Sequence, residues 1–300
     1  MRIGAHVSSA GKVWKAIERA QAIGAECIQI FVSPPQRWQA PFIPDEDVQE
    51  FRRLARQAGI GPVYLHAVYL INFATDDPDL YERSIYSLDG YLKMASRLGA
   101  AGVIAHMGSA GTRPVAEAEE SVALGLEAAL RKAENDVPVL IENNAGSGNC
   151  MGSRFDQIGR FIERAGGDAR LGVCLDTAHT FASGYDYPDT GGRQRMFAEI
   201  QASFGLERIR AVHVNDSKAR FGSGVDRHEN LGDGFIGLSG LREVILPLAA
   251  NGSDFLLEVP GYDGHGPDKR SVDLLRRLVR GEPIAAAPPV LFRLPQTAEG

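Results

Sequence analysis

The chain has 300 residues, of which 44% are hydrophobic and 23% are charged, and its formal net charge is −6. This composition fits a globular protein with one large core and argues against a generally basic, nucleic-acid-binding surface. No apolar run is as long as a membrane span, and the N-terminus becomes amphipathic too early for a signal peptide, so we expect a cytoplasmic protein. Three widely spaced cysteines without a C-x-x-C pair fit a reducing compartment.

Short apolar runs rich in β-branched residues alternate along the chain with longer amphipathic stretches. The runs predict eight strands, at residues 2–6, 26–31, 62–66, 102–106, 137–142, 171–176, 209–215 and 254–259. Helical spacing predicts helices between them, for example over 13–25, 45–59, 84–100 and 121–135. Gly24, Gly59 and Gly99 follow the last periodic residues of three helices, where a left-handed C-cap is expected.

A strand followed by a helix, repeated eight times, is the pattern of a (β/α)8 TIM barrel of the α/β class. We predict a single catalytic domain of this kind over residues 1–280. An open doubly wound sheet would usually carry a glycine-rich phosphate loop, and no G-x-G-x-x-G follows the first strand. Residues 281–300 are rich in Pro and Ala and lack helical periodicity, which predicts an irregular C-terminal tail.

Seven of the eight predicted strands end in a residue that is able to bind a metal ion. Because the chain has only 38 acidic residues and 7 histidines, chance would give this result with a probability of roughly 10⁻⁵. The seven residues are His6, His66, His106, Glu142, Asp176, His213 and Glu258. The carboxyl ends of barrel strands meet at one face, so we predict a ring of ligands there. His6 stays outside the predicted metal set, because from the first strand it can equally contact a ligand residue without binding the metal itself.

Three further candidates lie in segments that follow these strands. His179 comes three residues after Asp176, and one residue separates Asp226 from His228. In an extended segment this spacing points both side chains to the same side, so the pair is able to hold one ion. Alone, the pair would more often belong to a solvated loop, but together with His179 it supplies the three protein ligands of an open zinc site.

Five histidines and four carboxylates are too many ligands for one ion and suit three. Mixed imidazole and carboxylate ligation favours Zn²⁺, with Mn²⁺ or Fe as alternatives. Bound zinc lowers the pKa of water to about 7, which makes hydroxide available at neutral pH. Three divalent ions would carry more positive charge than four carboxylates neutralise, so an acidic protein would gain a positive cleft suited to phosphate.

Two loops at the same face carry aromatic and basic side chains. Gln36, Arg37 and Trp38 follow the second strand, where a guanidinium beside an indole suits a phosphate and a base; packing of Trp38 against the barrel rim is the alternative. Tyr69 and Leu70 follow the third strand, and such side chains wedge between bases in the minor groove. We predict DNA contacts at Gln36, Arg37, Tyr69 and Leu70.

Six longer stretches between Ile3 and about residue 280 carry a family resemblance: "IGAHVS", "YLINFA", "CLDTAHTFASGYD", "HVNDSK", "VDRHENLGDGFIG" and "LEVPGYDGHGPD". They resemble the endonuclease IV family of apurinic/apyrimidinic-site DNA repair enzymes. The resemblance implies a hydrolase that cleaves the phosphodiester 5′ to an abasic site in duplex DNA and leaves a 3′-hydroxyl. We expect a monomer that acts on duplex DNA with abasic or 3′-blocked sites.

The resemblance also implies how the nine ligands divide among three zinc ions. The three sets are His66, His106 and Glu142; Glu142, Asp176, His213 and Glu258; and His179, Asp226 and His228. Glu142, as a bridge between ions, and Glu258, which helps to orient the nucleophile, are the implied catalytic residues. Tyr69 and Leu70 resemble the family's wedge, which enters the duplex while the abasic nucleotide is flipped out.

The sequence departs from the family pattern at three places, none of which removes a ligand. Asn143 and Asn144 follow Glu142 where Thr-Ala is usual, Met107 stands where proline is common, and Gln36 stands where arginine is usual. The alternative function is a metal-dependent sugar isomerase or epimerase of the xylose-isomerase-like type, which needs the second ligand set but not the third. A non-enzymatic zinc- or DNA-binding module is a third class, although structural zinc sites are closed and usually contain cysteines.

Overall fold

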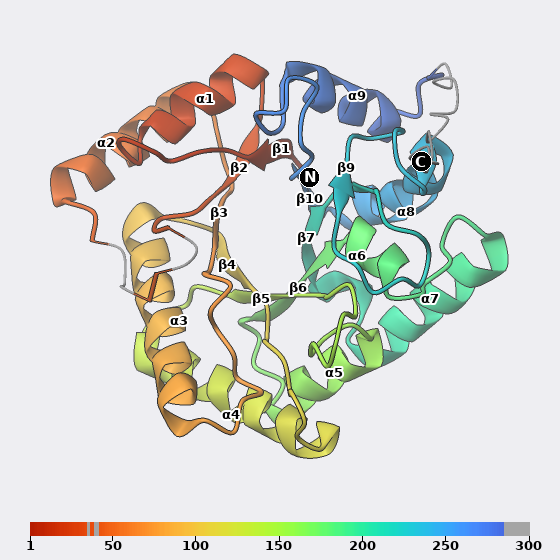
Figure 1. Cartoon of the computed structure of the whole chain (residues 1–300). Coiled ribbons are helices and arrows are strands. Elements are labelled where there is room, and N and C mark those ends of the chain that lie inside the picture. The colour runs from red at the N-terminus through yellow and green to blue at the C-terminus, as the bar shows by residue number, and fades with distance from the viewer. Residues whose placement is uncertain (35–36, 39–41, 285–300) are drawn as a thin grey trace, which may run out of the picture.

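The structure, a computed structural model, describes residues 1–34, 37–38 and 42–284. Eight parallel strands close into a barrel with helices around it, which confirms the predicted (β/α)8 architecture (Figure 1). The barrel strands are β1 (Ile3–His6), β2 (Cys27–Ile30), β3 (Val63–His66), β4 (Gly102–Ala105), β5 (Val139–Glu142), β6 (Leu171–Asp176), β7 (Ile209–His213) and β10 (Asp254–Leu257). Their ends differ from the predicted ones by at most two residues. Gln36 and the predicted tail beyond Ile284 lie outside the described residues.

The predicted helices also form. The helices of the described residues are α1 (Lys15–Ile23), α2 (Asp45–Ala58), α3 (Pro78–Leu98), α4 (Val115–Ala133), α5 (Phe155–Arg164), α6 (Thr177–Ala182), α7 (Thr190–Ser203), α8 (Gly237–Asn251) and α9 (Lys269–Val279). Gly24, Gly59 and Gly99 end α1, α2 and α3 with left-handed φ values of 75°, 65° and 71°, as predicted. Within the described ranges, none of the helices combines the length with the apolar character that a transmembrane segment needs.

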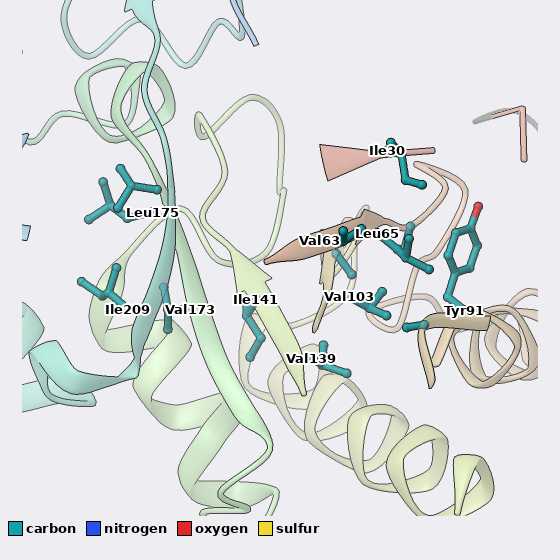
Figure 2. Packing of buried hydrophobic residues seen from close by; sticks show 14 of the residues in the cluster. Ile30, Val63, Leu65, Tyr91, Val103, Val139, Ile141, Val173, Leu175 and Ile209 are labelled. Atoms are coloured by element: carbon teal, nitrogen blue, oxygen red, sulfur yellow. The ribbon is translucent and has the colours of Figure 1, made fainter. Parts of the chain in front are cut away.

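Residues of the barrel strands alternate between two apolar layers because successive side chains point to opposite faces. Outward-pointing residues, such as Val139 and Ile141 of β5 and Val173 and Leu175 of β6, belong to the large core between strands and helices (Figure 2). Inward-pointing residues form a separate cluster, here called the inner layer: Cys27, Tyr64, Ile104, Leu140, Cys174, Ala211 and Leu256. At this level strand β1 contributes Gly4, where there is no room for a side chain. A Cβ on this residue would lie 1.7 Å from the carbonyl oxygen of Cys27.

The loop after β7 carries a small hairpin of its own. Strands β8 (Asp216–Ser217) and β9 (His228–Glu229) pair antiparallel, with Ser217 opposite His228. The buried Asp216 carboxylate accepts backbone hydrogen bonds from Ser217, Gly232, Ile236 and Gly237. One side chain therefore holds both ends of the segment that contains Asp226 and His228.

Candidate metal centre and active site

Directly above the inner layer, each barrel strand, or for β4 and β10 the residue that follows it, presents a polar side chain to the interior, because residues two apart share a face. We call this set the polar ring: His6, Gln29, His66, His106, Glu142, Asp176, His213 and Glu258. Seven of its members are the strand-end residues identified from the sequence. The eighth, Gln29, was missed because an amide is not a typical metal ligand, although its place opposite His6 follows from the same alternation.

Glu142 lies at the centre of the ring. Four imidazole nitrogens surround its carboxylate: Nε2 of His66 at 3.0 Å, Nδ1 of His213 at 3.0 Å, Nε2 of His106 at 3.3 Å and Nδ1 of His179 at 3.4 Å. The Glu142 side chain is only 1% exposed. A buried carboxylate among four imidazoles is a site built to hold positive charge.

The three loop candidates join this ring. Asp176 ends β6 and caps α6, since its Oδ1 accepts from the backbone N–H of His179 at 2.7 Å. From α6, the Nε2 of His179 lies 3.1 Å from Oδ1 of Asp226, and the same Asp226 oxygen is 3.4 Å from Nε2 of His228. His228 Nε2 also lies 3.5 Å from Oδ2 of Asp176. The hairpin thus brings the predicted Asp226 and His228 pair to the strand ends.

The side chains form three groups whose ligand atoms lie within 4.8 Å of one another. The groups are His66, His106 and Glu142; Glu142, Asp176, His213 and Glu258; and Asp176, His179 and His228. The groups are linked, because Glu142 belongs to the first two and Asp176 to the last two. Asp226 adds a carboxylate to the third group through its contacts with the two histidines.

Unsatisfied nitrogen atoms show that the third group fits a divalent cation. Nε2 of His179 and Nε2 of His228 are buried and face carboxylate oxygens, yet neither makes a hydrogen bond of acceptable geometry. Buried polar atoms in proteins are normally satisfied. Converging imidazole nitrogens and carboxylate oxygens are the donor set of a zinc-type site, and all three groups have this donor set.

The pKa values describe the same attraction for positive charge. Burial by itself raises the pKa of Glu142, but His106 and His213 outweigh it and hold this pKa well below its usual range. Burial lowers the pKa of His179, but Asp176 and Asp226 outweigh it, so that this pKa lies well above the ordinary value. For His106 burial dominates and lowers the pKa to about 4. Glu142 is therefore ionised, and the positions of His179 and His213, whose pKa values are both raised, favour a cation.

Buried amides hold several candidate ligands in place. Asn143 is one of the departures from the family pattern. Its side-chain Oδ1 accepts a hydrogen bond from the backbone N–H of Asp176 at 2.7 Å, and its backbone carbonyl oxygen lies 2.9 Å from Nδ1 of His179. Asn215 donates to Oδ2 of Asp176 at 2.7 Å and accepts from the backbone N–H of Glu258 at 2.9 Å. Asn215 lies within the "HVNDSK" stretch, so a sequence signal for it was present.

A cavity of about 600 Å³ opens above the ring. Side chains that line it include His6, Tyr69, Asp226, Arg227, His228 and Glu258. The Tyr69 side chain is 58% exposed, and its ring centroid lies 5.3 Å from that of His66 and 6.0 Å from that of His106. Leu70, in contrast, is half-buried and packs against the core. Arg37 is exposed in the loop after β2.

Comparisons with known proteins agree with this geometry. A family model described as xylose isomerase-like TIM barrel matches residues 17–278. A protein of Halothermothrix orenii named "Probable endonuclease 4" is 33% identical over 277 residues, which cover 92% of this chain and 100% of that protein. Endonuclease IV from Thermus thermophilus superposes with a TM-score of 0.82 at 35% identity, over 94% of this chain and 100% of the other.

The chain belongs to the endonuclease IV family. The resemblance inferred from the sequence motifs is thereby confirmed. A D-tagatose 3-epimerase-like protein also superposes, with a TM-score of 0.70 at 16% identity over 93% of this chain and 97% of that protein. At this identity the likeness shows a common barrel and nothing about chemistry. Endonuclease IV membership therefore distinguishes this chain within a fold that sugar epimerases share.

Proposed function

We propose that this chain is a zinc-dependent endodeoxyribonuclease that cleaves the phosphodiester 5′ to abasic sites in duplex DNA and leaves a 3′-hydroxyl. Endonuclease IV membership makes it a phosphodiester-cleaving hydrolase and supports DNA as the substrate. The observation that carries the proposal is the set of three linked ligand groups at one barrel mouth. Since one chain contains all of these side chains, we propose that it acts as a monomer.

Zinc suits the donors of all three groups, and we propose three ions per chain, with Mn²⁺ or Fe as alternatives at some positions. The proposed ligands are His66, His106, Glu142, Asp176, His179, His213, Asp226, His228 and Glu258. When bound, the ions would neutralise phosphate charge and lower the pKa of water toward neutrality. An acidic chain would in this way present a positive site to DNA.

Cleavage adds water across the bond between phosphorus and the 3′-oxygen: hydroxyl joins phosphorus, and the proton goes to the 3′-oxygen. Glu258 lines the cavity and its side chain is 14% exposed, so we propose that it orients the attacking water. Glu142 is buried below it among the imidazoles, which suits a bridging role. Both assignments match the roles that the sequence resemblance implied.

The rim supplies candidate DNA contacts. Tyr69 presents an exposed aromatic face beside the cavity, which suits a wedge against a base step. Leu70 would support this wedge from its half-buried position. Arg227 lines the cavity and Arg37 is exposed in the loop after β2, and both suit phosphate oxygens.

An incision assay tests the proposal. The substrate is an end-labelled duplex that contains one tetrahydrofuran abasic analogue, with the undamaged duplex as the control. Zinc-loaded protein is expected to cut only the damaged strand, and a DNA polymerase should extend the 3′-hydroxyl that results. Chelator should abolish the cut, and added Zn²⁺ should restore it. No incision by folded protein that retains its zinc would refute the proposal.

The same preparation separates the sugar isomerase or epimerase alternative. That chemistry would use the group with Glu142 and His213 and would leave the group with His179 and His228 without a role. We expect His228→Ala to abolish incision. Ketose–aldose interconversion or epimerisation that survives His228→Ala, in a protein that does not cut DNA, would instead favour the alternative.

A further inference from the structure

Gln29 and His6 are the members of the polar ring that belong to none of the three ligand groups. Gln29 is fully buried, at 0% exposed, in the middle of the barrel mouth. Its Oε1 lies 2.7 Å from Nε2 of His213, and its Nε2 donates to Oε1 of Glu258 at 2.6 Å. One amide therefore contacts two candidate ligands of the same group.

Glu258 fixes which way the amide of Gln29 points. A carboxylate only accepts hydrogen bonds, so the atom that faces Glu258 at 2.6 Å must be the amide NH₂. The reversed amide would set two oxygen atoms against each other at that distance. The amide oxygen must consequently face His213.

The orientation of this amide in turn fixes the tautomer of His213. An amide oxygen cannot donate, so Nε2 of His213 carries the hydrogen of that contact. In the neutral ring the lone pair then lies on Nδ1. Nδ1 is the atom that faces the carboxylates, at 3.0 Å from Oε1 of Glu142 and 3.2 Å from Oε2 of Glu258. The nitrogen left free to bind a cation thus points into the group.

We propose that Gln29 is a positioning residue for the ion held by Glu142, Asp176, His213 and Glu258, because it locks the His213 tautomer and tethers Glu258. The inference rests on the proposed metal-dependent function and does not depend on which DNA lesion is cut. Hydrogen-bond partners of metal-binding histidines commonly change metal affinity by about 10- to 100-fold.

Gln29→Met tests the inference because methionine keeps the length of the side chain and removes the hydrogen bonds to His213 and Glu258, together with a contact of 2.9 Å to Nδ1 of His6. In a graded series of chelator concentrations, we expect Gln29→Met to lose one ion per chain at a chelator concentration about 10- to 100-fold lower than the wild type requires. The other ions should be retained. Gln157→Met is the matched control, since Gln157 is a second buried amide, bonded to Glu119 and to the backbone of Gly152. This control should lower the unfolding temperature and leave ion retention unchanged.

A spectroscopic readout separates tautomer control from a general loss of stability. In zinc-loaded protein with ¹⁵N-labelled histidine, the Nε2–H of His213 should give a slowly exchanging signal that Gln29→Met abolishes. Gln29→Glu keeps an acceptor for His213 but opposes Glu258 with a second carboxylate. Gln29→Glu should therefore keep the His213 signal and still bind the ion more weakly. It serves as the test if Gln29→Met does not fold.

Wild-type ion retention together with an intact His213 signal in Gln29→Met would overturn this inference and leave the proposed function standing. The same holds for wild-type retention in Gln29→Glu. Wild-type protein that binds no ion at the His213 group would overturn the inference and the proposed metal-dependent function together.

Discussion

The candidate ligands are held in two different ways. Glu142 and His213 lie at strand ends, where their side chains are 1% and 0% exposed, and closure of the barrel dictates their separation. Asp226 lies in the loop after β7 with 59% of its side chain exposed, and His228 is 18% exposed. Their position depends on the β8–β9 hairpin and on Asp216. The barrel thus supplies a rigid frame, and a loop completes it, so the third group is the more easily perturbed.

Removal of the central frame ligand has the largest expected effect. Glu142→Gln takes a negative charge from between four imidazoles and from two linked groups. We expect incision to fall by about 10³-fold or more, with a loss of bound metal measured by elemental analysis. Glu127→Gln, at an exposed ion pair with Arg131 on α4, is the matched control and should keep full activity. Full metal content and activity in Glu142→Gln would contradict the central place given to this residue.

The frame itself is tested one layer lower, at Gly4. A Cβ on this residue would lie 1.7 Å from the carbonyl oxygen of Cys27, which cannot move without opening the β1–β2 pairing. We expect Gly4→Ala to lower the free energy of unfolding by about 3 kcal/mol. Gly222→Ala in the loop meets no atom within 4 Å but has a φ of +65°, so it should cost only about 1 kcal/mol. Urea unfolding compares the two, and equal losses would show that the frame is not the stiffer part.

Asp216 tests how the loop is held. Asp216→Ala leaves four backbone N–H groups without their acceptor, and we expect a loss of about 2 kcal/mol in unfolding free energy. Hydrogen exchange should increase more in residues 218–237 than in the barrel strands, where it should rise only as far as the lower free energy of unfolding requires. An equal increase in the loop and in the strands would mean that the loop and the frame do not separate as described.

The smallest effect is expected at the exposed loop ligand. Asp226→Asn replaces a carboxylate by a weaker neutral ligand, so one ion per chain should dissociate on the order of 10-fold more readily. Time-resolved transfer of zinc to a chromogenic chelator measures this change, and the two strand-held ions should keep their slower release. The control is Asp156→Asn, at a half-exposed ion pair with Arg160 on α5. Equal acceleration of all ions in Asp226→Asn would contradict the division into frame and loop.

Much of this arrangement follows from two periodicities in the sequence. Alternation along each strand and convergence of strand ends predicted that His66, Asp176 and His213 would meet. The strands stop earlier than expected at β4 and β10, where His106 and Glu258 follow one residue beyond the paired segment. Backbone pairing ends there while the inward direction of the side chain persists.

Other features depended on three-dimensional packing that no local pattern encodes. Gln29 carries no atom that typically binds zinc, so its contacts with His213 and Glu258 became visible only when the barrel closed. Leu70 was predicted to contact DNA beside Tyr69, but it packs partly into the core, and its DNA contact stays a prediction. The distance between Asp226 and His179 depends on the hairpin and was set by no spacing in the sequence.

Anomalous diffraction at the zinc edge from crystals of the metal-loaded protein tests the central claim most directly. The account predicts three zinc peaks at the barrel mouth, one in each ligand group, with Asp226 and His228 both on the ion that His179 binds. A single peak between Glu142 and His213, with Asp226 and His228 turned away from any ion, would contradict it.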